Sequence, residues 1–187
     1  MESTLRIEIR LGNLTDQNDV EAIVNPTNDY LMLNGTTGGE IRKRAGDAID
    51  AEAQSKGQIA LGEAVHTSSG KLPFRHIIHA AVIGLRQEDL QVKKRAGSAT
   101  SGDIIGAATL NALDLANFLG LESIAFPPLG VADADYPAVN CADVMLAQIR
   151  AYASNNPESS LKRVIIVAPD RETFQIFDRK TIQQMAS

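Results

Sequence analysis

Hydrophobic and polar positions along the chain follow two periods, one of about 2 residues and one of about 3.6, which mark strands and amphipathic helices respectively. Leu5, Ile7 and Ile9 alternate with charged residues. This alternation predicts a half-exposed strand at the edge of a sheet. Short apolar runs predict five further strands, at residues 22–24, 64–67, 77–83, 123–126 and 164–168.

Helical spacing appears between these strands. One helix is expected to begin near Gly38, with Ile41, Ala45, Ala48 and Ile49 on its buried face. Strands that alternate with helices of this length predict a parallel or mixed sheet covered by helices on both faces. Other helices are expected at residues 105–119, after a polar loop at 84–102, at 138–152, and around Phe174 and Phe177.

Length, composition and charge narrow the class of protein. The 187 residues, 44% hydrophobic and 22% charged, are expected to form a single soluble domain, 1–187. The net charge of −5 gives no attraction to nucleic acid or to an anionic membrane. The one cysteine, Cys141, excludes an internal disulfide and favours a cytoplasmic location. We expect no metal, no cofactor and no membrane partner. The sequence does not identify a protein partner.

The stretch from Ala22 to Gly46 carries the first candidate for chemistry. A short apolar strand leads into Asn25 and Asn28, then into a loop of Gly, Thr and Asn residues, and then into the helix near Gly38. This order places side-chain amides and free backbone N–H groups at the carboxyl end of a strand, facing a helix N-terminus. Open α/β sheets bind ligands at such places, and helix N-termini attract phosphate. The stretch therefore indicates a nucleotide-like ligand.

A second loop, Pro127–Pro137, follows the strand at 123–126 and is expected at the same edge of the sheet. Together with the first loop it resembles the macro domain family, the ADP-ribose-binding α/β/α module. The family pattern is an apolar strand, Asn-Ala-Ala-Asn, a leucine, a glycine-rich loop and a helix. This chain follows it with Val24, Asn25, Pro26, Thr27, Asn28, Leu31, residues 34–39 and Ile41, and the similarity continues through 61–82, 109–130 and Pro137.

The resemblance implies a three-layer α/β/α fold with a mixed, mostly parallel central sheet covered by helices on both faces. It also implies a small-molecule ligand of the ADP-ribose type. In this sequence Asn13 would read adenine, and Asn25 and Asn28 would address the distal ribose. The implied ligand-binding residues are Asn13, Leu14, Asn25, Asn28, Asn34, Gly35, Thr36, Thr37, Gly130, Val131, Ala132, Asp133 and Ala134.

Both loops depart from the family pattern. Asn34, Thr36 and Thr37 stand where small residues, largely glycines, are expected, and Asn13 stands where the family usually carries an aspartate. The second loop carries alanine and aspartate at its expected glycines. An aspartate about 6 Å from a phosphate oxygen, at an effective dielectric constant of about 20, repels it by roughly 3 kcal/mol per charge pair. The directions of the Asp133 and Asp135 side chains therefore decide how well a diphosphate binds, and the sequence does not give them.

Hydrolysis of ADP-ribose esters or ADP-ribosylated groups would need further residues. Family hydrolases resemble one another in the asparagine present here as Asn28, the one candidate catalytic residue. In one hydrolase branch they also share an acidic residue, whose position falls on Gly38. Asp29 and Glu40 flank the loop without standing at that position. We expect at most a weak hydrolase activity.

Two functions stay open at this stage. The first is binding of ADP-ribose or a related nucleotide metabolite. The second is a degenerate macro domain that has lost this ligand and binds another ligand or a protein partner. A phosphate ion trapped beside Gly35–Gly39 would favour the first function, and a side chain that fills this space would favour the second. Asn25 and Asn28 can also act only as turn caps, and His79 and Cys141 are expected to be core residues.

Overall fold

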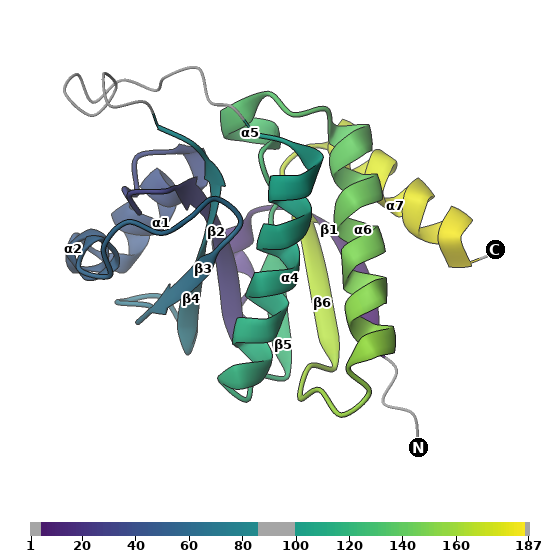
Figure 1. Ribbon diagram of the computed structural model, residues 1–187, viewed down its shortest axis with the longest axis horizontal. Coiled ribbons are helices and arrows are strands. Elements are labelled where there is room, and N and C mark those ends of the chain that lie inside the picture. The colour runs from purple at the N-terminus through teal and green to yellow at the C-terminus, as the bar shows by residue number, and fades with distance from the viewer. Residues whose placement is uncertain (1–4, 86–99, 186–187) are drawn as a thin grey trace.

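The computed structural model describes residues 5–85 and 100–185. A six-stranded sheet with the order β1-β6-β5-β2-β4-β3 forms the middle layer, with helices on both sides (Figure 1). The strands are β1 (Arg6–Leu11), β2 (Ala22–Asn28), β3 (Ala64–Thr67), β4 (His76–Ile83), β5 (Ser123–Phe126) and β6 (Arg163–Ala168). β3 is antiparallel to β4, and the other neighbouring pairs are parallel. The predicted mixed, mostly parallel sheet is confirmed, with β1 at its edge.

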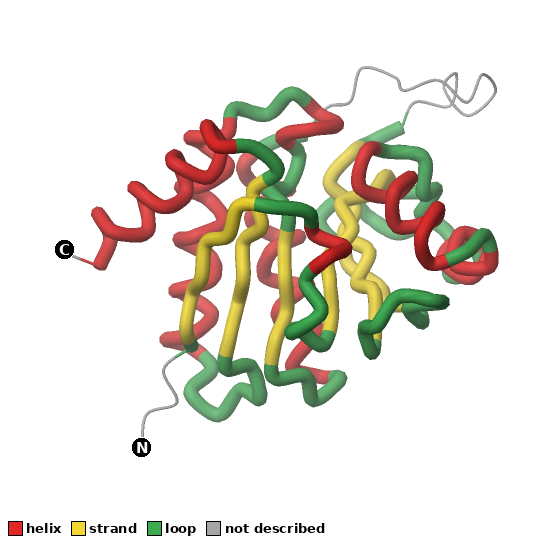
Figure 2. Tube along the Cα trace, turned by 180° about the vertical axis from the view of Figure 1, so that it is seen from behind, coloured by secondary structure: helices red, strands yellow, loops and turns green. Residues whose placement is uncertain are grey.

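Two hydrophobic cores pack against the two faces of the sheet. The larger core lies under α4 (Gly102–Phe118), α6 (Ala138–Asn155) and α7 (Arg171–Met185), which cover the face seen in Figure 1. The smaller core lies on the opposite face, seen in Figure 2, under the 3-10 helix η1 (Leu14–Asp16), α1 (Thr36–Ala45) and α2 (Ala48–Gln54). Within the described residues, no helix is long and apolar enough to cross a membrane.

The helix predicted from Gly38 onward is two helices. α1 ends at Ala45, and α2 begins at Ala48 after a break at Gly46, whose φ is 104°. A residue in this conformation cannot continue a right-handed helix, so the break is built into the backbone. The prediction of a single helix was wrong because the apolar spacing runs unchanged across the break.

Two short helices had no counterpart in the sequence prediction. One is η1, and the other is α5 (Val131–Ala134), inside the second candidate loop. The polar stretch predicted at 84–102 falls mostly outside the described residues, which resume at Thr100. The remaining predicted strands and helices agree with the structure to within a few residues, apart from β2, which extends beyond residue 24 as far as Asn28.

The parallel strands place the candidate loops together. β1, β6, β5, β2 and β4 run in one direction, so their carboxyl ends meet at a single edge of the sheet. The loop before η1 follows β1, the 29–35 loop follows β2, and the Pro127–Pro137 loop follows β5. This edge is where open α/β sheets bind ligands.

Candidate functional site

A cavity of about 360 Å³ opens at the carboxyl ends of these five parallel strands. Residues of β2, β4 and β6 and the segments that follow β1, β5 and β6 contribute to its wall. The first turns of α1 and α7 also face it, with Thr36, Thr37 and Thr173. The cavity therefore combines strand ends with the N-terminus of a helix, as the sequence predicts.

Eight of the thirteen predicted ligand-binding residues line this cavity: Asn13, Leu14, Thr36, Thr37, Gly130, Val131, Ala132 and Asp133. Asn25, Asn28, Asn34, Gly35 and Ala134 are not among the residues that line it. The loop regions predicted from the two motifs thus meet in space, whereas the two motif asparagines are buried and do not line the cavity. Their direct contact with a ligand stays a prediction.

Asn13, which lines the cavity, is held in place by its neighbours. Its Oδ1 accepts a hydrogen bond from Thr15 N at 3.1 Å, so Asn13 caps η1, and Oδ1 also lies 3.0 Å from Thr15 Oγ1. Its Nδ2 donates to Glu40 Oε1 at 2.6 Å. The Thr15 hydroxyl also lies 2.6 Å from the same Glu40 oxygen. The side chain expected to read adenine is therefore held in one orientation by α1.

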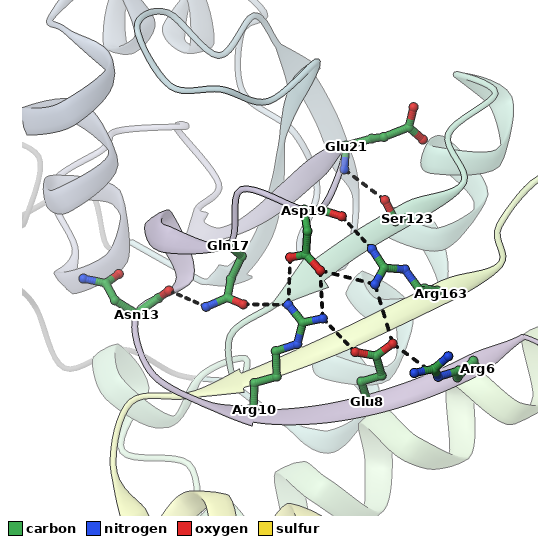
Figure 3. A network of polar contacts seen from close by, with 9 residues as sticks. All are labelled: Arg6, Glu8, Arg10, Asn13, Gln17, Asp19, Glu21, Ser123 and Arg163. Carbon is green, nitrogen blue, oxygen red and sulfur yellow. Dashed lines mark hydrogen bonds and ion pairs between the residues drawn. The ribbon is translucent and has the colours of Figure 1, made fainter.

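A polar network anchors the loop that carries Asn13 (Figure 3). Gln17 Nε2 donates to the Asn13 carbonyl at 2.9 Å, and Arg10 donates to both Gln17 and Asp19. Arg163 donates to the backbone oxygen of Asp19 at 2.5 Å. The hydrogen bond from Arg10 lowers the pKa of Asp19 to about 2, with a further contribution from Arg163. These contacts hold the loop against β1 and β6, so the backbone at Asn13 is held in place before a ligand binds.

Asn25 belongs to a buried hydrogen-bond chain. It is fully buried, and its Nδ2 lies 3.1 Å from His79 Nδ1, while His79 Nε2 lies 2.8 Å from Thr67 Oγ1. Thr67 Oγ1 donates to the Ser68 carbonyl, so His79 Nε2 carries the ring proton and Nδ1 accepts from Asn25. Burial lowers the pKa of His79 to about 4. His79 is therefore a neutral core histidine, as expected.

Gly38 packs directly against this chain. A Cβ atom at residue 38 would lie 3.1 Å from Leu33 Cα and 3.3 Å from Asn25 Oδ1. The position of the hydrolase-branch acid is therefore closed to a side chain unless its neighbours move. A side chain at residue 38 would require Leu33 or Asn25 to move by a few tenths of an ångström.

Asn28 organises the turn that follows β2. Its Oδ1 accepts from the backbone N–H groups of Tyr30 and Met32, both at 3.1 Å, and its Nδ2 donates to the Met32 carbonyl and to Asn34 Oδ1. Within this turn Leu31 adopts a φ of 59°, which is uncommon for a bulky residue. Both polar ends of the Asn28 side chain are thus used to hold the turn.

The direction of Asp133, which the sequence could not give, is into the first candidate loop. Its Oδ1 and Oδ2 accept from Thr36 N at 3.0 and 3.2 Å, and Oδ1 also accepts from Thr36 Oγ1 at 2.8 Å. Asp135 is exposed, has a left-handed backbone with a φ of 50°, and does not line the cavity. Ala132 lies within α5 and needs no positive φ, so the loss of a glycine there causes no strain.

Several residues that line the cavity were not predicted as ligand-binding. Glu40 contacts both Asn13 and Thr15. Asp170 accepts from the backbone N–H and hydroxyl of Thr173 at 2.8 and 3.0 Å. The order Pro169-Asp170 after a buried strand is a helix-start signal that could have located α7 at this edge. Among the described residues that line the cavity, three carry carboxylates and none is Lys, Arg or His. No group of three or more described His, Cys, Asp or Glu residues is placed to hold a metal ion.

Comparison with known proteins decides the family. The family model described as "Macro domain" matches residues 24–145, which is more than half of the chain. The chain belongs to the macro domain family. A macro domain-containing protein of Listeria monocytogenes is 31% identical over 179 residues, covering 94% of this chain and 96% of the relative.

Some relatives of this macro domain are longer proteins. An uncharacterized protein of Thermotoga maritima is also 31% identical over 179 residues, but the chain spans only 28% of its length. Among solved structures, a mutant of the Oceanobacillus iheyensis macrodomain with ADPR superimposes with a TM-score of 0.82 at 25% identity. That superposition covers 100% of this chain and 97% of the other. The α/β/α fold predicted from the resemblance is confirmed.

Proposed function

We propose that this macro domain binds ADP-ribose or a closely related nucleotide metabolite in the cavity at the strand ends. The observation that carries the proposal is the meeting of the two candidate loops around this cavity, at the N-terminus of α1. A relative with the same fold was crystallised with ADPR, which supports the choice of ligand. The cavity volume of about 360 Å³ lies within the range usual for small-molecule sites.

In this proposal the diphosphate lies between Thr36 and Thr37 on one side and Gly130–Ala132 on the other. Backbone N–H groups at the start of a helix are suited to phosphate. Adenine lies near Asn13 and packs against Leu14. The distal ribose lies toward Asn25 and Asn28. The proposed function is binding. Hydrolysis has less support, because Asn28 is engaged in its turn and the position of the hydrolase-branch acid is a glycine, Gly38.

One observation favours the second function, a degenerate macro domain. The Asp133 carboxylate lies against Thr36 N and beside Gly35. A phosphate ion in this space would favour the first function, whereas a side chain occupies it here. A macro domain closed in this way would bind another ligand or a protein partner. The two functions differ in whether the contact between Asp133 and Thr36 opens for a diphosphate.

Calorimetric titration with ADP-ribose, with AMP and ribose 5-phosphate as controls, separates these functions. We expect ADP-ribose to bind with a dissociation constant in the micromolar range, about −8 kcal/mol. The two fragments should bind much more weakly, because each occupies only part of the cavity. Absence of heat with ADP-ribose at millimolar concentration would reject the proposal for this chain.

A further inference from the structure

We propose that Asp133 is a specificity-determining residue that competes with the ligand's diphosphate for the N-terminus of α1. This inference rests on the proposed function, because it concerns the same cavity. The carboxylate reaches from α5, after β5, across to α1, after β2, and so joins the two loops that face each other over the cavity.

The competition follows from the donors that Asp133 uses. Thr36 is the first residue of α1, and the first N–H groups of a helix have no carbonyl partner within it. Both Asp133 oxygens accept from Thr36 N, and one also accepts from the Thr36 hydroxyl. A phosphate oxygen that binds at Thr36 would need these same donors. A bound carboxylate and a bound phosphate therefore exclude each other at Thr36.

Gly35 makes room for this carboxylate. A Cβ atom at residue 35 would lie 2.9 Å from Asp133 Oδ2 and 3.3 Å from Asp133 Cγ. The Gly35 backbone, with φ −77° and ψ −177°, is extended and open to any residue. Glycine is therefore not needed at residue 35 for its backbone conformation. Its lack of a side chain is what lets the Asp133 carboxylate lie against the start of α1.

The other two carboxylates of the cavity have separate tasks. Glu40 accepts from Asn13 Nδ2 and lies 2.6 Å from the Thr15 hydroxyl, and Asp170 caps the first turn of α7 through Thr173. Asp133 is the carboxylate that contacts the first residue of α1. Replacing this single carboxylate is therefore expected to change the anion affinity of the whole cavity.

The test compares Asp133→Asn with the matched control Asp135→Asn, titrated with ADP-ribose and, separately, with inorganic pyrophosphate. Both variants remove one negative charge from the same loop, but only Asp133 lines the cavity. Asparagine keeps the volume of Asp133 and can still accept from Thr36. We expect Asp133→Asn to bind ADP-ribose about 10- to 100-fold more tightly than the wild type, since one charge within about 6 Å of the diphosphate is removed. Asp135→Asn should stay within about twofold of the wild type.

The two ligands separate this inference from the proposed function. If the wild type binds ADP-ribose and Asp133→Asn binds it equally or less tightly, the inference is overturned and the proposed function stands. If Asp133→Asn alone gains affinity for pyrophosphate while no chain binds ADP-ribose, the inference stands and the proposed function fails. Absence of binding by every chain to both ligands overturns both.

A second variant tests the contact without removing the carboxylate. In Gly35→Ala the new methyl group would displace the Asp133 side chain, because the carboxylate is the flexible partner in the overlap. The amide proton of Thr36 should therefore shift in the NMR spectra of both Gly35→Ala and Asp133→Asn relative to the wild type. A Thr36 amide that keeps its wild-type shift in both variants would contradict the contact itself.

Discussion

Acidification from pH 7 to pH 4 is expected to remove about 3 kcal/mol of folding free energy through His79 alone. His79 is fully buried, and burial lowers its pKa from 6.5 to about 4, partly offset by the charge of Glu52. Below pH 6.5 the unfolded chain takes up a proton at this residue, whereas the folded chain does so only near pH 4. The unfolded state therefore binds more protons throughout this window, and stability falls as the pH falls.

Urea unfolding of the wild type and of His79→Gln at both pH values measures this loss. Glutamine offers one acceptor and one donor group, for Asn25 and Thr67, but does not titrate. The loss of stability on acidification should be about 3 kcal/mol smaller in the variant. His66, whose pKa is also lowered by burial, is present in both chains and cancels in the comparison. Equal losses in both chains would contradict the assignment of His79 as a neutral core residue.

Replacing Gly70 by alanine is expected to destabilise the domain by about 3 kcal/mol or more. Gly70 has a φ of 56°, and a Cβ atom there would lie 2.3 Å from the Ala45 carbonyl oxygen and 3.1 Å from its carbon. The neighbouring Lys71 N donates to the same Ala45 oxygen at 2.9 Å. The substitution would therefore both strain the backbone and push the β3–β4 loop away from the end of α1.

Gly57→Ala is the matched control for Gly70→Ala. Gly57 also has a positive φ, 79°, but a Cβ atom there would meet no atom within 4 Å. Gly57→Ala should cost only the backbone strain, about 1–2 kcal/mol. Urea unfolding of both variants gives the difference, which reports the collision with Ala45. Equal costs would show that the loop moves freely and does not hold α1.

The fold could be predicted from the sequence largely because its strands carry strong patterns. β1 shows strict alternation, and β5 and β6 are short apolar runs closed by Pro127 and Pro169. The break between α1 and α2 was missed because apolar residues continue at helical spacing across Gly46. A φ of 104° at one residue does not change the spacing of the hydrophobic residues around it, so the hydrophobic pattern does not reveal the break.

The candidate site was predicted as two loops and not as a set of contacts. The loops could be located because both follow parallel strands at one edge of the sheet. The direction of Asp133 depends on α5 and on the room left by Gly35, neither of which is visible in a hydrophobic pattern. The buried positions of Asn25 and Asn28 likewise depend on their partners His79 and Met32, which the sequence alone does not pair with them.

Cys141 belongs to a residue type that can act as a nucleophile or a metal ligand, but its surroundings make it a core residue. It is fully buried, its thiol donates to the Leu129 carbonyl, and burial raises its pKa to about 12. A thiol in this state is neither a nucleophile nor a metal ligand at neutral pH. The expectation that Cys141 behaves as a small hydrophobic core residue is confirmed.

The most direct test of the central claim is an amide chemical-shift map of the ¹⁵N-labelled protein on addition of ADP-ribose. We predict that the largest shifts occur at Thr36, Thr37 and Gly130–Ala132, which line the cavity at the strand ends. Ala107 and Ala147, which line the separate groove between α4 and α6, should not shift and serve as internal controls. Absence of shifts at millimolar ADP-ribose, or shifts centred on the α4–α6 groove, would contradict the assignment of this cavity as the ADP-ribose site.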